Sequence, residues 1–167
     1  SSAAWHAAPG SDAAAGSAGH AAWAAAARTA VPAGDAAARR AHDHGLIVHM
    51  DGARLMNACV KLGVSAAEML AEVDSVSLCL SKGLGTPAGS VLAGSKAMIR
   101  KAHRARKLLG GGMRQIGVLA AAGVYALNHN IERLADDHAN ALRLAEALRG
   151  IPGLQVAPDE VQTNMVF

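Results

Sequence analysis

Lys82 and Asp51 are the two residues whose types and surroundings are best suited to chemistry. Lys82 follows the apolar run SVSLCLS and precedes the glycines of GLG, and Asp51 follows a second apolar run, LIVHM. A lysine amine at the end of a strand can hold the aldehyde of pyridoxal phosphate as a Schiff base, and a carboxylate can pair with the protonated pyridine nitrogen of that cofactor. Together the two residues make a hypothesis for a cofactor site.

Three motifs extend this hypothesis: HMDGAR, CLSKGLGTPAGS and LLGGGMRQ occur in this order along the chain. Their order and separations resemble those of the low-specificity L-threonine aldolases, which are pyridoxal phosphate enzymes of the aspartate aminotransferase-like fold, fold type I. The resemblance runs from about Val31 to Phe167. It implies an aldehyde-lyase that cleaves L-threonine or L-allo-threonine to glycine and acetaldehyde.

The same resemblance implies roles for four residues. Lys82 is the implied catalytic residue and holds the cofactor, and Asp51 is implied to pair with the pyridine nitrogen. Arg54, in DGAR, is implied to bind the carboxylate of the amino acid substrate, for which a planar guanidinium is well suited. Arg114, after three glycines, is implied to approach the cofactor phosphate, in a neighbouring subunit of a homo-oligomer. No histidine is assigned, because the one that stacks on the cofactor ring in this family belongs to a preceding segment.

Each of these residues also has an ordinary structural interpretation. Asp51 could cap the next helix, Arg54 could be a surface arginine or pair with Asp51, and Lys82 could be a solvated lysine at a strand end. The glycines before Arg114 could simply separate two helices. The setting of Lys82, between an apolar strand and glycines, favours a partly desolvated amine.

The predicted elements bring Asp51 and Lys82 to one edge of a sheet. Open α/β sheets bind ligands beyond the carboxyl ends of their strands, and both residues follow a predicted strand. The last predicted strand is antiparallel in the family. The expected strands cover 46–50, 75–80 and 90–94. The expected helices cover 36–45 after an Asp35 cap, 53–63, 66–73 after a Ser65 and Glu68 capping box, 96–109, and 115–148 with a break near 128–130.

The length of the chain, 167 residues, suggests part of a larger enzyme, since members of the family are roughly twice as long. We expect residues 31–150 to form part of the cofactor-binding large domain, an incomplete α/β unit with a mostly parallel sheet and flanking helices. Residues 151–167 would begin the link to a small domain. Residues 1–30 contain 15 alanines and no Val, Ile, Leu, Met or Phe, which indicates a low-complexity arm without a match to the family.

The charge of the chain does not indicate a nucleic-acid partner. The formal net charge of +3 depends on six cations in one predicted helix without an acid, and the chain has only one Phe and one Tyr to stack on bases. A solvated or subunit-facing helix is the favoured interpretation. The six cations are Lys96, Arg100, Lys101, Arg104, Arg106 and Lys107.

Other residue patterns argue against several classes of protein. Cys59 and Cys79 lie in apolar segments, which predicts buried thiols of a reduced, cytoplasmic protein without a disulfide. No run of about 18 apolar residues is present to cross a membrane. The histidines have no metal-ligand spacing, so no metal is expected, and GLGTPAG is not a dinucleotide fingerprint.

Two alternatives to threonine cleavage remain open. The first is another pyridoxal phosphate lyase or an aminotransferase on the same fold. The second is an inactive, truncated product that acts at most as an interaction domain.

Overall fold

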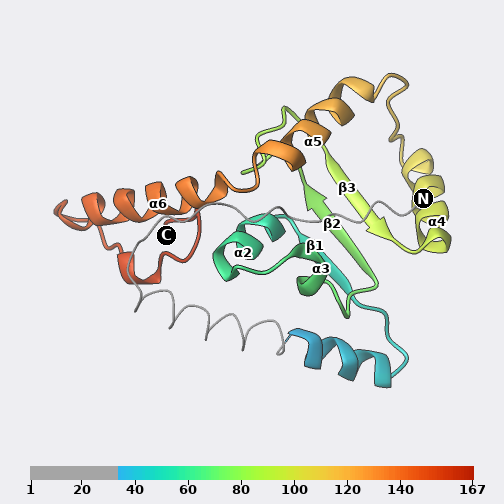
Figure 1. Cartoon of the computed structure of the whole chain (residues 1–167), viewed down its shortest axis with the longest axis horizontal. Helices are drawn as coiled ribbons and strands as arrows, with labels where there is room; N and C mark the ends of the chain where they lie inside the picture. The colour runs from blue at the N-terminus through green and yellow to red at the C-terminus, as the bar shows by residue number, and fades with distance from the viewer. Residues whose placement is uncertain (1–33) are drawn as a thin grey trace.

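The computed structural model describes residues 34–167, and these residues form a three-stranded sheet flanked by helices (Figure 1). The α/β class predicted from the sequence is confirmed. A helical segment over residues 34–43 comes first. The elements after it are β1 (His49–Gly52), α2 (Leu55–Leu62), α3 (Ala66–Met69), β2 (Ser75–Cys79), β3 (Ser90–Gly94), α4 (Lys96–Leu108), α5 (Gly117–His129), α6 (Leu134–Arg149) and the 3₁₀ turn η1 (Pro158–Glu160).

Strand β2 is the central strand of the sheet. It pairs in parallel with β1, with His49 opposite Ser75, and antiparallel with β3, with Gly94 opposite Ser75. The predicted direction of each strand is therefore confirmed. Because β1 and β2 run in parallel, their carboxyl ends open onto the same edge of the sheet.

One face of the sheet packs on α2 and α3. Leu55 and Cys59 of α2 are buried against Val76 of β2, with Met50 and Leu78 half-buried beside them. Side chains alternate along a strand, so the neighbours of these residues point to the other face. That face is polar on β1 and β2, where it carries His49, Asp51, Ser75, Ser77 and Cys79.

A second apolar cluster fixes the loop that follows β2. Leu80 and Leu84 are 6% and 3% exposed and pack against Ala126 of α5, which is 1% exposed. Burying each leucine contributes roughly 1.5–3 kcal/mol. This loop is therefore held on α5 by the residues on both sides of Lys82.

Local sequence signals set several helix ends as predicted. Helix α2 ends at Gly63, whose φ of 61° lies in the left-handed region that favours glycine. Helix α3 begins at a capping box, in which the Ser65 side chain accepts from the Glu68 amide and the Glu68 carboxylate accepts from the Ser65 amide. The predicted break between the last two long helices follows His129, and α6 begins at Leu134.

Several predicted boundaries are wrong. The first strand ends at Gly52 and so includes Asp51, which was expected to follow it. The first strand begins at His49, and Leu46 and Ile47 are 60% and 83% exposed. The reason is that β2 begins opposite His49, so that no strand among the described residues pairs with the earlier part of the run. Asp35 lies within a helical segment that already includes residue 34, so it does not cap it. Helix α3 ends at Met69, earlier than expected.

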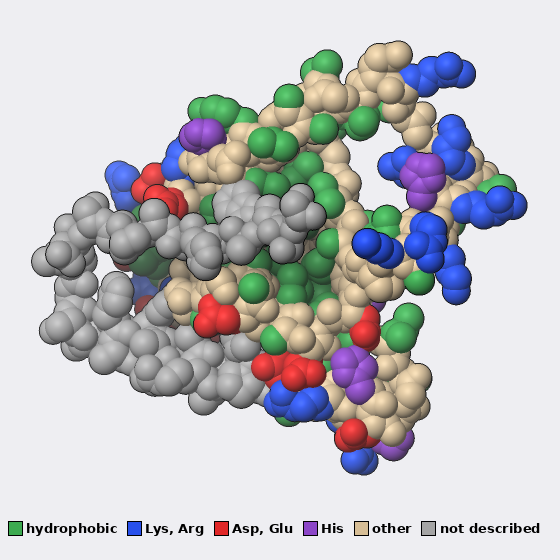
Figure 2. Space-filling view, turned by 45° about the vertical axis from the view of Figure 1, so that its right-hand side comes forward, with side chains coloured by type: hydrophobic (Ala, Val, Ile, Leu, Met, Phe, Trp, Pro, Cys, Tyr) green, Lys and Arg blue, Asp and Glu red, His purple; other side chains and the backbone are tan. Residues whose placement is uncertain are grey.

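Helix α4 lies on the surface beside β3 and has no buried residue. Figure 2 shows its Lys and Arg side chains gathered on one side of the molecule. In the described part of the chain no helix is both long and apolar enough to cross a membrane. The predicted Ala-rich arm, residues 1–30, lies outside the described residues.

Candidate functional site

Asp51 lies near the carboxyl end of β1, on the polar face of the sheet. Its side chain is exposed, and its Oδ1 accepts a hydrogen bond of 3.1 Å from the Ala53 amide. This bond shapes the turn between β1 and α2. The interpretation of Asp51 as a cap of the next helix is wrong, because α2 has Arg54 at its N-cap position and no side-chain cap. The bond occupies Oδ1. The second carboxylate oxygen, Oδ2, has no hydrogen-bond partner among residues 34–167 and could accept from a ligand.

Gly52 allows β1 and β2 to approach each other at this point. A Cβ added to Gly52 would lie 2.8 Å from the carbonyl oxygen of Ser77 and 2.8 Å from Cγ2 of Val76. Any side chain there would push β1 away from β2, since the backbone oxygen cannot move independently of the strand. The glycine of the DGAR motif therefore keeps Asp51 in register beside the strand that leads to Lys82.

Arg54 immediately precedes α2 and is exposed. Its carbonyl accepts from the Ala58 amide, whereas its guanidinium forms no ion pair with any residue of the described chain. The interpretation of Arg54 as an ion-pair partner of Asp51 is therefore wrong in this structure. The guanidinium stays available to an anion that reaches the edge of the sheet.

Lys82 lies in a tight turn three residues after β2 ends. Its carbonyl accepts a 2.8 Å hydrogen bond from the amide of Gly85, whose φ of 75° favours glycine. The Thr86 amide closes the loop on the carbonyl of Leu80 at 3.1 Å. The sequence setting of Lys82 predicted a partly desolvated amine. Lys82 is instead exposed, because no residue of the described range 34–167 covers it.

Asn130 holds the Lys82 turn and Asn57 lies beside it, and the sequence analysis assigned neither of them. Asn130, at the end of α5, donates from Nδ2 to the carbonyl of Leu84 at 2.8 Å. Asn57, in the first turn of α2, is 4% exposed and lies 3.2 Å from His138 Nε2 on α6. A polar residue on the buried face of an apolar helix was the one available signal for Asn57.

Arg114 is not gathered with the other candidate residues. It is exposed in the connection between α4 and α5, directly before α5 begins. Figure 1 shows this connection extending away from the loop that joins β2 and β3. The role of Arg114 beside the cofactor, in a neighbouring subunit, stays a prediction.

A cavity of about 450 Å³ lies at the outer edge of β1. It is lined by Asp51 and His49 together with residues of the 34–43 helical segment and of α3, but it includes neither Lys82 nor Arg54. The candidate site lies at the carboxyl edge of the sheet, where the parallel strands β1 and β2 both end. No group of His, Cys, Asp and Glu within residues 34–167 could hold a metal ion.

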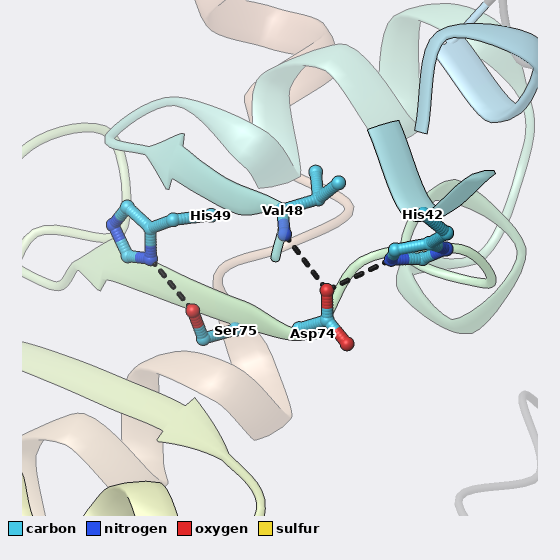
Figure 3. A network of polar contacts seen from close by, with 5 residues as sticks. All are labelled: His42, Val48, His49, Asp74 and Ser75. Carbon is cyan, nitrogen blue, oxygen red and sulfur yellow. Dashed lines mark hydrogen bonds and ion pairs between the residues drawn. The ribbon is translucent and has the colours of Figure 1, made fainter. Parts of the chain in front are cut away.

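A polar network joins the helical segment 34–43 to the beginning of the sheet (Figure 3). Asp74 Oδ2 accepts from the Val48 amide at 2.7 Å and lies 2.9 Å from Nε2 of His42. Nearby, His49 Nδ1 and Ser75 Oγ are 2.9 Å apart across the two strands. The network fixes the register in which Asp51 is placed, but it lies at the opposite end of the strands from Lys82.

The charge of Asp74 should contribute to stability only above acidic pH. The bond from the Val48 amide, and second the contact with His42, lower the pKa of Asp74 from its usual value of 3.8. A lowered carboxyl pKa stabilises the fold above the unfolded-state pKa, and this contribution disappears as the pH falls through the folded-state pKa. We therefore expect Asp74→Asn to lower the urea midpoint at pH 7 and to approach the wild type at an acidic pH, as the pH falls below 3.8 and through the folded-state pKa.

Asp74→Ala provides the comparison for this experiment, because asparagine can still accept from the Val48 amide and alanine cannot. Alanine should therefore be less stable than asparagine at both pH values. A difference between wild type and Asp74→Asn that persists or grows on acidification would contradict the assignment.

The two cysteines are free. Cys59 is buried in α2, and burial raises the pKa of its thiol to about 11. It is therefore a neutral core residue near neutral pH, as its apolar surroundings predicted. Cys79 is half-buried at the end of β2, where its sulfur accepts a long hydrogen bond of 3.7 Å from Ser90.

Comparisons with known proteins agree on one family. The model of the β-eliminating lyase family matches residues 29–167. The "Probable low-specificity L-threonine aldolase 2" of Arabidopsis thaliana is 54% identical over 127 residues, which are 76% of this chain and 36% of that protein. The low specificity L-threonine aldolase of Escherichia coli K12 is 50% identical over 125 residues, 75% of this chain and 37% of that protein. The chain thus spans a little over a third of the length of these relatives.

Two solved structures share the arrangement of these elements. A protein of Exiguobacterium sp. 255-15, described as an aromatic amino acid β-eliminating lyase/threonine aldolase, matches with a TM-score of 0.72 and 28% identity. A protein of Listeria monocytogenes EGD-E, described as an L-allo-threonine aldolase, matches with a TM-score of 0.70 and 28% identity. Each match covers 79% of this chain and 37% of the solved chain.

Proposed function

This chain belongs to the β-eliminating lyase family, and from that premise we propose that the complete polypeptide cleaves L-threonine or L-allo-threonine to glycine and acetaldehyde, using pyridoxal phosphate. The relatives named as low-specificity L-threonine aldolases support this choice of reaction. The observation that carries the proposal is the parallel pairing of β1 with β2, since Asp51, near the end of β1, and the turn of Lys82, after β2, then lie at one edge of the sheet.

The residues at this edge fit the cofactor in their chemistry. Lys82 offers a primary amine, and Asp51 keeps a carboxylate oxygen without a protein partner among residues 34–167. Both are exposed, so a ligand could reach them without a change in the strands. When bound, pyridoxal phosphate supplies an electron sink for the electron pair of a broken Cα–Cβ bond.

Lys82 is the proposed covalent anchor of the cofactor and the proposed catalytic residue. The turn around it is fixed by the Gly85 amide and by the buried leucines on both sides, so that its backbone is already ordered before a ligand binds. An ordered backbone lowers the entropy that the lysine must lose when it forms the covalent link.

Asp51 is the proposed partner of the cofactor's ring nitrogen, and Arg54 is the proposed partner of the substrate carboxylate. The Asp51 carboxylate would accept from the protonated ring nitrogen and keep the proton on that atom, which maintains the electron-withdrawing power of the ring. The Arg54 guanidinium would bind the substrate carboxylate in a bidentate manner and so set the angle of the Cα–Cβ bond relative to the ring. Arg114 is proposed to bind the cofactor phosphate from a neighbouring copy in a homo-oligomer.

Product analysis tests the proposed reaction directly. The complete polypeptide, loaded with pyridoxal phosphate, should release equimolar glycine and acetaldehyde from L-threonine or L-allo-threonine. Release of ammonia and a keto acid from an aromatic amino acid, without aldol cleavage, would instead support the β-eliminating activity that the name of the Exiguobacterium protein includes. A loaded polypeptide that produces neither set of products would refute both reactions.

Replacing Arg54 by leucine should weaken substrate binding and leave cofactor binding nearly unchanged. Loss of hydrogen bonds to a charged group costs about 1.5–3 kcal/mol, which corresponds to an increase in KM for threonine of about tenfold to a hundredfold. Arg104→Leu, a change at an exposed arginine of α4, is the matched control and should alter neither quantity. An equal loss of cofactor affinity in Arg54→Leu would show that Arg54 acts on the cofactor and not on the substrate.

A further inference from the structure

The turn that carries Lys82 contacts two helices at its first glycine. A Cβ added to Gly83 would lie 2.6 Å from Cδ2 of Leu134 on α6 and 3.3 Å from Oδ1 of Asn57 on α2. Leu134 is 1% exposed and Asn57 is 4% exposed, so both are fixed by their surroundings. The place of Lys82, one residue before this contact, therefore depends on where α2 and α6 hold Gly83.

A partly buried polar contact joins these two helices beside the turn. Asn57 Nδ2 and His138 Nε2 are 3.2 Å apart, although the two residues are 81 positions apart in the sequence. His138 lies four positions after Leu134, so the two side chains share one face of α6. Leu134 lies against Gly83, and His138 contacts Asn57, which also lies beside Gly83.

The chemistry of the contact favours a neutral histidine. The Asn57 amide donates from Nδ2, so His138 must accept at an unprotonated Nε2. The pKa of His138 is lowered from 6.5, first by burial and second by the charge of Lys61 on α2, while Asp137 on α6 acts in the opposite direction. Near neutral pH the imidazole is therefore uncharged and able to accept.

We propose that the contact between Asn57 and His138 positions the Lys82 turn, which makes buried Asn57 and half-buried His138 positioning residues for the reaction of the Lys82 amine. This inference rests on the proposed function, because it takes Lys82 as the anchor of the cofactor. Without the contact, a buried amide loses its partner and α2 can shift relative to α6. Gly83 would move with them, and the lysine amine would leave its reactive position.

Labelling of Lys82 measures the effect without relying on catalytic activity. The complete polypeptide, freed of cofactor, is mixed with pyridoxal phosphate, quenched with borohydride after increasing times, and digested to quantify label on the Lys82 peptide. Asn57→Leu and His138→Leu should lower the initial labelling rate by about tenfold to a hundredfold, the range expected for a group displaced by about 1 Å. His138→Gln should keep the wild-type rate, because its amide oxygen can accept from Asn57.

Leu70→Ala serves as the control for general loss of stability. Leu70 is half-buried against the cluster of Leu55, Cys59 and Val76, which includes none of Gly83, Leu134 and His138. Its truncation should lower the urea midpoint and leave the labelling rate of Lys82 unchanged. If Leu70→Ala slows labelling as much as His138→Leu does, the contact has no specific positioning role and the inference is wrong.

Hydrogen exchange gives a second measurement that needs no destabilised variant. The amides of Gly85 and Thr86 are bonded within the Lys82 turn, so their protection factors report its order. In the wild type, these protection factors should fall as the pH is lowered through the pKa of His138, whereas in His138→Gln they should not. Protection that is independent of pH in both proteins would overturn the inference.

The outcomes also separate this inference from the proposed function. If wild-type Lys82 takes up no label, the cofactor role of Lys82 is wrong and the inference fails with it. If wild-type Lys82 is labelled and the Asn57 and His138 variants are labelled at the same rate, the proposed function stands and the positioning role is refuted.

Discussion

Lys82→Ala should abolish covalent capture of pyridoxal phosphate and lower the rate of threonine cleavage on the order of 10³-fold or more. The effect should come from chemistry and not from unfolding. Lys82 is exposed, and within residues 34–167 its turn is held by backbone bonds and by buried leucines that the substitution leaves in place. The melting temperature of the cofactor-free polypeptide should therefore stay close to that of the wild type.

Two comparisons sharpen this prediction. Lys82→Arg keeps the positive charge but removes the nucleophilic amine, so it should be as inactive and as unlabelled as Lys82→Ala. Lys96→Ala changes an exposed lysine of α4 and should retain both the covalent capture of pyridoxal phosphate and the cleavage of threonine. Borohydride-fixed label on the peptides of Lys61, Lys96 or Lys101, in place of Lys82, would overturn the assignment.

Local signals in the sequence were sufficient where the chain satisfies its own backbone. Gly63 adopts a positive φ and ends α2, and Ser65 and Glu68 exchange hydrogen bonds within one turn. In each case the partners are at most three or four residues apart, so that the residue types alone determine the outcome. The direction of β2 and the alternation of strands and helices follow from equally regular patterns.

Long-range pairing was not predictable in the same way. Leu46 and Ile47 belong to an apolar run, but a strand forms only where a partner strand is present, and β2 begins opposite His49. Asn57 and His138 meet only after α2 and α6 pack together. A pattern read along one segment contains no information about such a partner.

The candidate site was predicted in its residue types but only partly in its arrangement. Asp51 lies near the end of β1, and Arg54 and Lys82 follow β1 and β2, at the edge expected from the parallel order of these strands. All three are exposed, and Arg114 lies in a separate connection, because residues 34–167 do not enclose this edge of the sheet. The contacts within residues 34–167 do not bring the four side chains together around a closed site. Their roles in binding and catalysis therefore stay predictions.

The structure predicts that Asp51→Asn isolates the effect of one charge. An asparagine Oδ1 can still accept from the Ala53 amide, so the turn between β1 and α2 should keep its geometry and the polypeptide its stability. A neutral amide cannot hold a proton on the ring nitrogen of pyridoxal phosphate as a carboxylate does, which weakens the electron sink during bond cleavage.

We therefore expect Asp51→Asn to retain borohydride-fixed label on Lys82 while single-turnover cleavage of threonine slows by about 10²- to 10³-fold, the usual cost of losing one preorganised electrostatic partner. Asp43→Asn, at an exposed aspartate in the helical segment 34–43, is the matched control and should cleave at the wild-type rate. An unchanged rate in Asp51→Asn would remove Asp51 from the site. A loss of label equal to that of Lys82→Ala would instead assign Asp51 to cofactor capture, since a carboxylate that only tunes the ring should act after the covalent link has formed.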